Sequence, residues 1–147
     1  MSSPIPQEER LVAAARAVLE QAHAPYSGYA VGAALLDDAG EIHVGCNVEN
    51  ASFGLTICAE RTALAHAVSQ GARRFEALAI AFGSEPVVPP CGACRQFLAE
   101  FAPDLPVAWA GPREVVGRAS LRELLPGAFE GGFLAVDRRP SAGDPGS

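Results

Sequence analysis

The chain has 147 residues, of which 49% are hydrophobic and 19% are charged, and these proportions are typical of one globular domain with a single core. Its formal net charge of −6 argues against binding to nucleic acid, which needs a basic face, and favours a small substrate. No apolar run is long enough to span a bilayer, and residues 1–10 have neither the basic nor the apolar part of a signal peptide, so we expect a cytoplasmic protein with no membrane partner.

The spacing of apolar and turn residues predicts helices and strands in alternation. Apolar residues at helical spacing predict a helix over 7–22. Two strands over 29–36 and 41–47 flank a turn of Asp and Gly residues and are most simply a hairpin. The further predicted elements, in chain order, are a helix over 58–70 ended by Gly71, a strand over 75–82, a proline-containing loop over 83–90, a helix over 91–101, short strands over 105–110 and 114–118, and a short helix opened by a capping box at 120–123.

This alternation predicts an α/β fold, a three-layer α/β/α sandwich in which helices cover both faces of a mixed sheet of about five strands. The hairpin makes one part of the sheet antiparallel, and the later strand–helix–strand units allow parallel pairing. We expect residues 1–136 to form a single domain. Residues 137–147 are rich in Pro, Gly, Ser and charged residues, which predicts a disordered tail.

Two short stretches, 56–61 and 90–96, carry three thiols and one carboxylate. Cys91 and Cys94 have the C-x2-C spacing with which two thiolates bind one metal ion, and Cys58 would supply a third ligand. Three protein ligands leave the fourth tetrahedral position of Zn²⁺ open, which is typical of a catalytic site. Glu60 can move protons at that open position. The sequence therefore predicts one catalytic zinc ion per subunit.

Other sites share parts of this pattern. A lone C-x2-C also occurs in redox dithiols and in structural zinc knuckles, but a redox site has no use for Cys58 and Glu60. A knuckle needs a fourth ligand, and Cys46 is the candidate, although inside a predicted strand it is expected to act as a small apolar residue. Three further candidate ligands lack a paired ligand spacing: His23, His43 and His66.

The negative charge of three thiolates needs a nearby positive group to offset it. Each candidate ligand stretch opens a predicted helix, where free N–H groups lower the pKa of a thiol. Three thiolates on Zn²⁺ still leave a formal charge of −1, which weakens the ability of the ion to acidify bound water. Arg61 follows Cys58 by one helical turn and Arg95 follows Cys94 directly, so we expect at least one of these arginines to donate to a ligand thiolate.

The order Cys-x-Glu followed by Pro-Cys-x-x-Cys is typical of zinc deaminases. Longer blocks, 25–35, 45–61 and 124–129, closely resemble the small homotetrameric cytidine deaminases, and the likeness extends over residues 7–129. The resemblance implies zinc-dependent hydrolytic deamination of cytidine and 2′-deoxycytidine to uridine and 2′-deoxyuridine, with release of ammonia, in pyrimidine salvage. Zinc-bound hydroxide would attack C4 while Glu60 shuttles the protons.

The resemblance also implies roles for residues around the substrate. Asn47 and Glu49 would hydrogen-bond the ribose hydroxyls, although read alone they are an ordinary polar pair at a strand end. Tyr29 stands where the family usually has a Phe against the pyrimidine, and its alternative is a core aromatic. The backbone of Ala59 would face the base. Phe129 would reach the base from a neighbouring subunit, or else pack in the C-terminal core. The homotetramer, with sites completed by neighbouring subunits, is implied by the resemblance alone.

Three rival functions remain open. A deaminase of another nucleoside-like ring, such as the blasticidin type, would share the zinc site, but the block with Asn47 and Glu49 and the ending 124–129 favour cytidine. Deaminases of tRNA or DNA are disfavoured by the acidic balance of the chain. A non-catalytic zinc-binding interaction module would hold metal but show no turnover.

Overall fold

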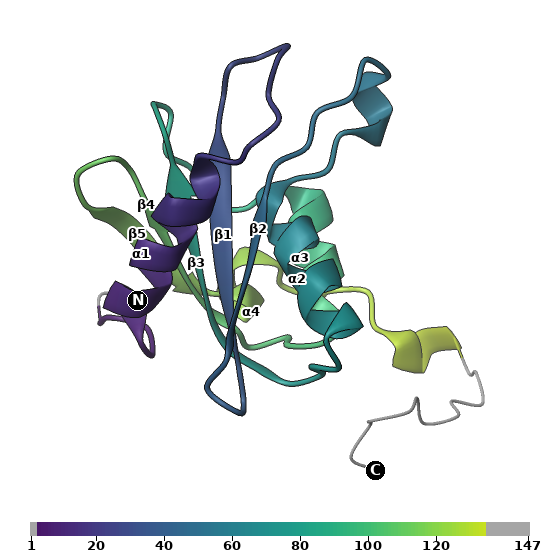
Figure 1. Ribbon diagram of the computed structural model, residues 1–147. Coiled ribbons are helices and arrows are strands. Elements are labelled where there is room, and N and C mark those ends of the chain that lie inside the picture. The colour runs from purple at the N-terminus through teal and green to yellow at the C-terminus, as the bar shows by residue number, and fades with distance from the viewer. Residues whose placement is uncertain (1–2, 135–147) are drawn as a thin grey trace.

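The computed structural model of the chain describes residues 3–134, so the predicted tail over 137–147 lies outside the described residues. A five-stranded sheet with the order β2-β1-β3-β4-β5 forms the centre of the fold (Figure 1). Its strands β3 and β4 are parallel and the other neighbours are antiparallel, which confirms the predicted mixed sheet. The strands are β1 (Val31–Asp37), β2 (Ile42–Cys46), β3 (Phe75–Phe82), β4 (Pro106–Ala110) and β5 (Val115–Ser120).

Helices cover both faces of the sheet. Figure 1 shows α1 across one face, with α2 and α3 together on the other, so the predicted three-layer sandwich is confirmed. None of the helices among residues 3–134 has the length and apolar character needed to cross a membrane. The helices are α1 (Glu8–Leu19), α2 (Ala59–Ser69), α3 (Gly92–Ala99) and α4 (Leu121–Leu124), with short 3₁₀ turns at η1 (Phe53–Leu55) and η2 (Gly131–Leu134).

The two faces of the sheet carry side chains of different size. On the α1 side the central strand β3 presents only alanines, and this lets α1 lie close to the backbone of β1. A Cβ atom added at Gly32 would come within 2.0 Å of the Ala15 carbonyl oxygen of α1. Alternate side chains of β3 divide between the two layers, with Leu78, Ile80 and Phe82 on the α2 and α3 side and Ala77, Ala79 and Ala81 on the α1 side.

The helix ends agree with the sequence prediction within three residues. The helix predicted to reach residue 22 ends at Leu19, because the amides of Gln21 and Ala22 bond to carbonyls three residues back and tighten the chain into a turn. Gly71 has a φ of 96°, which suits its predicted role after α2. The predicted capping box is present at the start of α4, where the Ser120 and Glu123 side chains each accept from the other's backbone amide.

Candidate active site

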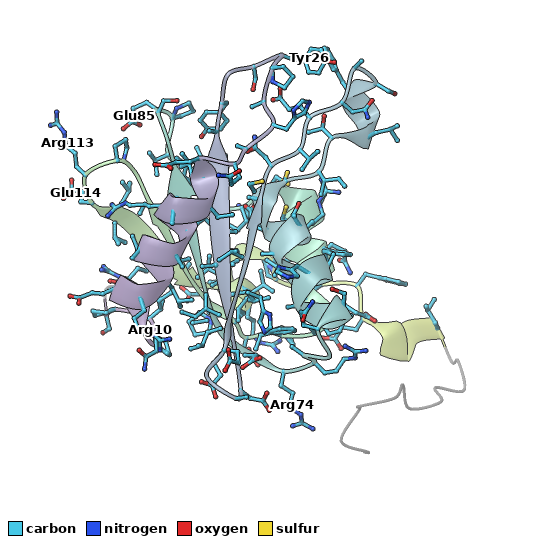
Figure 2. The ribbon with its side chains drawn as sticks, viewed as in Figure 1. Arg10, Tyr26, Arg74, Glu85, Arg113 and Glu114 are labelled. Atoms are coloured by element: carbon cyan, nitrogen blue, oxygen red, sulfur yellow. The ribbon has the colours of Figure 1, made fainter. Side chains whose placement is uncertain are left out.

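The starts of two helices bring the three predicted zinc ligands together. Cys58 is the N-cap of α2, Cys91 is the N-cap of α3, and Cys94 lies one turn into α3, where it is fully buried. Their three Sγ atoms all lie within 4.8 Å of one another. Sulfur atoms, drawn in yellow, gather near the start of α2 in Figure 2. Cys58 precedes Cys91 by 33 residues in the sequence, and the fold brings it together with Cys91 and Cys94 in one cluster.

The spacing of the cluster suits a tetrahedral zinc ion. Two thiolates that each lie about 2.3 Å from a tetrahedral zinc are about 3.8 Å apart. The Sγ atoms of Cys58 and Cys91 are 3.7 Å apart. Three soft sulfur donors within 4.8 Å of one another would leave one position of a tetrahedral zinc ion for a ligand from outside the chain.

The pKa values of the Cys58 and Cys94 thiols are shifted in opposite directions. Hydrogen bonds from Cys94, Arg61 and Cys91 stabilise the Cys58 thiolate and lower its pKa to about 5, against the opposing effect of burial. The hydrogen bond between Cys94 and Cys58, together with burial, raises the pKa of the Cys94 thiol. Cys58 therefore ionises more readily than Cys94, and a cation that binds both of these sulfurs must displace the proton of Cys94.

The two predicted outer-shell arginines differ in their contacts. The Nη2 atom of Arg61 lies 3.7 Å from the Cys58 sulfur and 3.4 Å from the Thr56 carbonyl oxygen. Its Nε atom is buried and has no hydrogen-bond partner among the residues that the structure describes. Arg95 instead donates to two backbone carbonyls, of Pro90 at 2.7 Å and of Leu124 at 2.6 Å. Of the two arginines, Arg61 is the one that contacts a ligand sulfur in the described part of the chain.

Glu60 lies beside the cluster, in the first turn of α2. It is 5% exposed, and burial raises its pKa to about 7, with a further rise from the Cys58 thiolate and an opposing effect from a backbone hydrogen bond. A carboxyl group with this pKa can both take up and release a proton near neutral pH.

A pocket of about 520 Å³ opens over the thiols and Glu60. This volume is within the range of small-molecule sites, roughly 300–1,000 Å³. Cys58, Cys91 and Arg95 contribute to its lining. The predicted substrate and proton-transfer residues that line it are Tyr29, Asn47, Glu49, Ala59 and Glu60.

The side chain of Asn47 joins two segments at the pocket. Its Oδ1 atom accepts from the Val31 amide at 2.9 Å, and its Nδ2 atom donates to the Tyr29 carbonyl at 2.7 Å. These bonds hold the entry to β1 against the residue that follows β2. One N–H of the Asn47 amide group is not needed for either bond.

Glu49 holds the turn before β1 in a similar way. Its carboxylate accepts from the amides of Tyr26 at 3.0 Å and Ser27 at 3.1 Å, and also from the Ser27 hydroxyl. The hydroxyl bond is the main reason that the Glu49 pKa lies below its ordinary value. The carboxylate therefore stays ionised at neutral pH beside the pocket.

Comparison with known proteins identifies the family. A sequence model described as the cytidine and deoxycytidylate deaminase zinc-binding region matches residues 5–108. The chain belongs to the cytidine and deoxycytidylate deaminase family. The matched region is a zinc-binding one, so zinc is the cofactor of this family member.

Relatives of the deaminase chain span most of its length. It is 48% identical over 122 residues to the cytidine deaminase of Sporosarcina psychrophila, which is 82% of this chain and 90% of the relative. It is 45% identical over 123 residues to that of Mycobacterium tuberculosis, 80% of this chain and 86% of the relative. The crystal structure of the Burkholderia pseudomallei cytidine deaminase matches with a TM-score of 0.78 and 46% identity, covering 82% of this chain and 98% of that one.

Phe129 lies away from the pocket of its own chain. Its side chain is 58% exposed, and its carbonyl accepts from Nε2 of Gln96 in α3 at 2.9 Å. It lines a separate, smaller pocket of about 190 Å³ with Ala99 and Glu100. Within one deaminase chain, therefore, the structure does not bring Phe129 together with the other predicted substrate residues.

The alternative ligands lie outside the thiol cluster. Cys46 ends β2 and is half-buried, and it is not among the residues that could share one metal ion in the described range. His43 bonds instead to the Asp37 carboxylate at 2.8 Å, and His66 to the Val44 carbonyl at 3.0 Å. Within residues 3–134 the cluster thus has three protein ligands and no fourth, which argues against a closed structural knuckle.

Sequence reasoning missed one wall of the pocket. Val88, Pro89 and Pro90, here called the pocket wall, line the site together with Phe82 at the end of β3. Only their position in the sequence could have indicated this role, because residues that directly precede a metal-binding cysteine lie beside the metal site. The prolines predict only a loop.

We expect Cys94→Ser to lower the affinity of the chain for zinc by more than about 100-fold, because it removes a ligand and not an outer-shell contact. Cys46→Ser is the matched control and should keep one zinc ion per chain. Metal analysis after dialysis and competition with a chromophoric chelator measure both. Equal loss of zinc in the two variants would contradict this ligand set.

Proposed function

We propose that this chain deaminates cytidine and 2′-deoxycytidine hydrolytically, producing the corresponding uridines and ammonia, with Cys58, Cys91 and Cys94 as zinc ligands. The observation that carries the proposal is the buried carboxyl of Glu60, which lies beside a three-thiol cluster at a pocket of nucleoside size. The relatives named above are cytidine deaminases over most of the chain, which supports the choice of substrate.

Glu60 carries the protons of this reaction. Zinc, when bound, supplies a water whose pKa is low enough to ionise near neutral pH. Replacing the amino group at C4 of the ring by oxygen takes two protons from the attacking water, of which the first goes to the ring nitrogen and the second to the leaving amine. A single carboxyl with a pKa of about 7 can accept each of these protons from oxygen and then release it to nitrogen.

The walls of the pocket orient the nucleoside. Asn47 has an N–H donor left after its bond to the Tyr29 carbonyl, and Glu49 has acceptor capacity left, so the pair suits the hydroxyls of a sugar. The Tyr29 ring offers a flat apolar surface to the pyrimidine. The backbone of Ala59, at the start of α2, faces the base.

Arg61 offsets the excess negative charge of the site. Its guanidinium contacts the Cys58 sulfur and draws charge away from the thiolate, which leaves the metal a stronger Lewis acid. Arg95 acts on the site indirectly, because it bonds to the Pro90 carbonyl and so fixes the backbone next to the ligand Cys91.

We further propose that four copies assemble and that Phe129 enters the pocket of a neighbouring copy. Phe129 is exposed in the single chain, and so are apolar side chains on the segments beside the pocket. These segments contain Tyr26, Val48, Phe53 and Ile57. Val48 pairs with Ile57, and the Tyr26 ring packs edge-on against Phe53. An exposed apolar surface next to a substrate site is suited to a subunit contact.

The cellular setting follows from the thiols and the charge. Three cysteines that must stay reduced to bind zinc fit the cytoplasm, where thiols are kept free, and pyrimidine salvage is the matching pathway. The net charge of −6 gives no basis for nucleic-acid binding. Residues 1–136 are proposed to act as one catalytic domain.

Glu60→Gln should lower the rate of cytidine deamination by at least about 10²–10⁴-fold while zinc stays bound, because the amide keeps the shape but cannot transfer the protons. The fall in ultraviolet absorbance on mixing with cytidine measures the rate. Near-normal turnover in a zinc-loaded variant would refute the role of Glu60. If zinc-loaded wild type leaves both nucleosides unchanged, another ring or a non-catalytic zinc module is the better function.

Arg61→Ala should weaken zinc binding by about 10- to 100-fold. It should also move the acid limb of the pH–rate profile to higher pH, because uncompensated thiolates make the metal a weaker acid. Arg61→Lys keeps a positive charge and should recover part of both effects. A profile and an affinity equal to wild type in Arg61→Ala would show that the contact with Cys58 has no role in the chemistry.

Mixed assemblies test the position of Phe129. Phe129→Ala and Glu60→Gln should each have low activity alone. When the two variants are co-expressed with different tags and co-purified, roughly a quarter of the sites pair an intact Glu60 with an intact Phe129 from a neighbour, if subunits mix at random. Recovered activity supports a site shared between subunits. No recovery in verified mixed assemblies would contradict it, because a Phe129 that served its own chain could not complement.

A further inference from the structure

The segment over 83–90, between β3 and α3, carries the pocket wall of residues 88–90 and is held to the rest of the fold at four points. At its start the Gly83 amide bonds to the Ala30 carbonyl at 3.0 Å. At its end Arg95 bonds to the Pro90 carbonyl at 2.7 Å. Between them Val87 packs against the core under α2 and α3. The fourth point is Pro86.

The hydroxyl of Tyr29 donates to the carbonyl of Pro86, 57 residues away. Burial, and then the charges of Glu85 and Glu60, raise the pKa of the Tyr29 phenol, so the hydroxyl keeps its proton at neutral pH and can act as donor. Figure 2 shows Glu85, the neighbour of Pro86, at the same end of the molecule as Tyr26, which precedes β1. The bond therefore joins the two segments that border the pocket at this end.

The same side chain also faces the pocket. The Tyr29 ring lines it and packs against the Phe82 ring, with centroids 5.7 Å apart and planes inclined by 31°. The Tyr29 side chain has little freedom to rotate. Its Cβ is attached to the backbone, its ring packs against Phe82, and its hydroxyl bonds to the Pro86 carbonyl. The hydroxyl thus sets the orientation of the ring and the position of the segment over 83–90 together.

We propose that the Tyr29 hydroxyl is a specificity-determining group, which holds the pocket wall close to the ring of the nucleoside and limits the size of a substituent at C5. This rests on the proposed function. The wall directly precedes Cys91 and so lies beside the metal site, where the reacting carbon C4 must be. In the pyrimidine ring, C4 is bonded to N3 and C5. Glu60 delivers a proton to N3, so C5 is the ring atom that faces the pocket wall. A Phe at position 29 would keep the stacking surface and lose the bond.

The test compares Tyr29→Phe with Tyr26→Phe. The second variant removes the same hydroxyl from an exposed tyrosine three residues away and is the matched control. The loss of one hydrogen bond is worth about three- to tenfold in an equilibrium. In Tyr29→Phe, we expect the peptide over 83–91 to exchange its amide hydrogens about three- to tenfold faster, the KM for cytidine to rise by a similar factor, and the preference in kcat/KM for cytidine over 5-methylcytidine to fall at least threefold.

Each result decides the proposal. Faster exchange with a reduced preference, in Tyr29→Phe and not in Tyr26→Phe, supports it. Faster exchange with an unchanged preference overturns it, since the bond would then hold the loop without selecting substrates. Unchanged exchange overturns it as well. If wild type is inactive on cytidine, the proposed function itself fails, and the exchange measurement still shows separately whether the hydroxyl holds the loop.

Discussion

The close approach of α2 to the sheet is the constraint on which the site depends. A Cβ atom at Gly45 of β2 would lie 2.3 Å from the Ala63 backbone nitrogen, so only a glycine lets the helix backbone lie at this depth. Buried alanines and Leu64 fill the contact further along the helix. The depth and rotation of α2 fix its first residues, and with them the positions of Cys58 and Glu60. Packing one turn away from the chemistry therefore sets the geometry of the chemistry.

The site concentrates negative charge that the bare fold tolerates poorly. Three thiols and one carboxyl lie close together, with Cys94 and Glu60 buried, and each buried charge costs several kcal/mol unless it is paired. The fold limits this cost by raising the pKa values of Cys94 and Glu60, which favours their protonated forms, and by placing Arg61 against Cys58. A divalent cation removes the need for those protons. Zinc binding, proton release and stability are therefore coupled in this chain.

Much of the fold could be predicted because its signals are local. The glycine after α2, the capping box before α4 and the apolar run of β3 each depend on neighbouring residues, and β3 was predicted to the residue. The C-x2-C spacing predicted only that Cys91 and Cys94 share a metal ion, and the inclusion of Cys58 depended on the order Cys-x-Glu followed by Pro-Cys-x-x-Cys. The layer assignment within β3 was not predictable, because a strand buried on both faces shows no alternation of polar and apolar residues.

The remaining features depend on contacts between distant segments. Nothing near Arg95 in the sequence indicates that it bonds to the Leu124 carbonyl, and nothing near Tyr29 indicates Pro86. Phe129 shows the same limit at the level of subunits. The resemblance assigns it to the base, but in a single chain it lies beside Gln96 of α3 and does not line the pocket. Such contacts become visible only when the chain, or the assembly, is considered in three dimensions.

The polar groups proposed to bind the substrate already make hydrogen bonds within the fold. The Asn47 amide holds the entry to β1, and the Glu49 carboxylate holds the turn before it, so changing either removes bonds that the unliganded protein already uses. Loss of activity at these two positions therefore mixes binding with the placement of the backbone. The hydroxyl of Tyr29 differs, because it is one atom at the end of a ring that stays packed without it. Specificity can change there while the fold is kept, and this is the kind of position at which related enzymes can diverge.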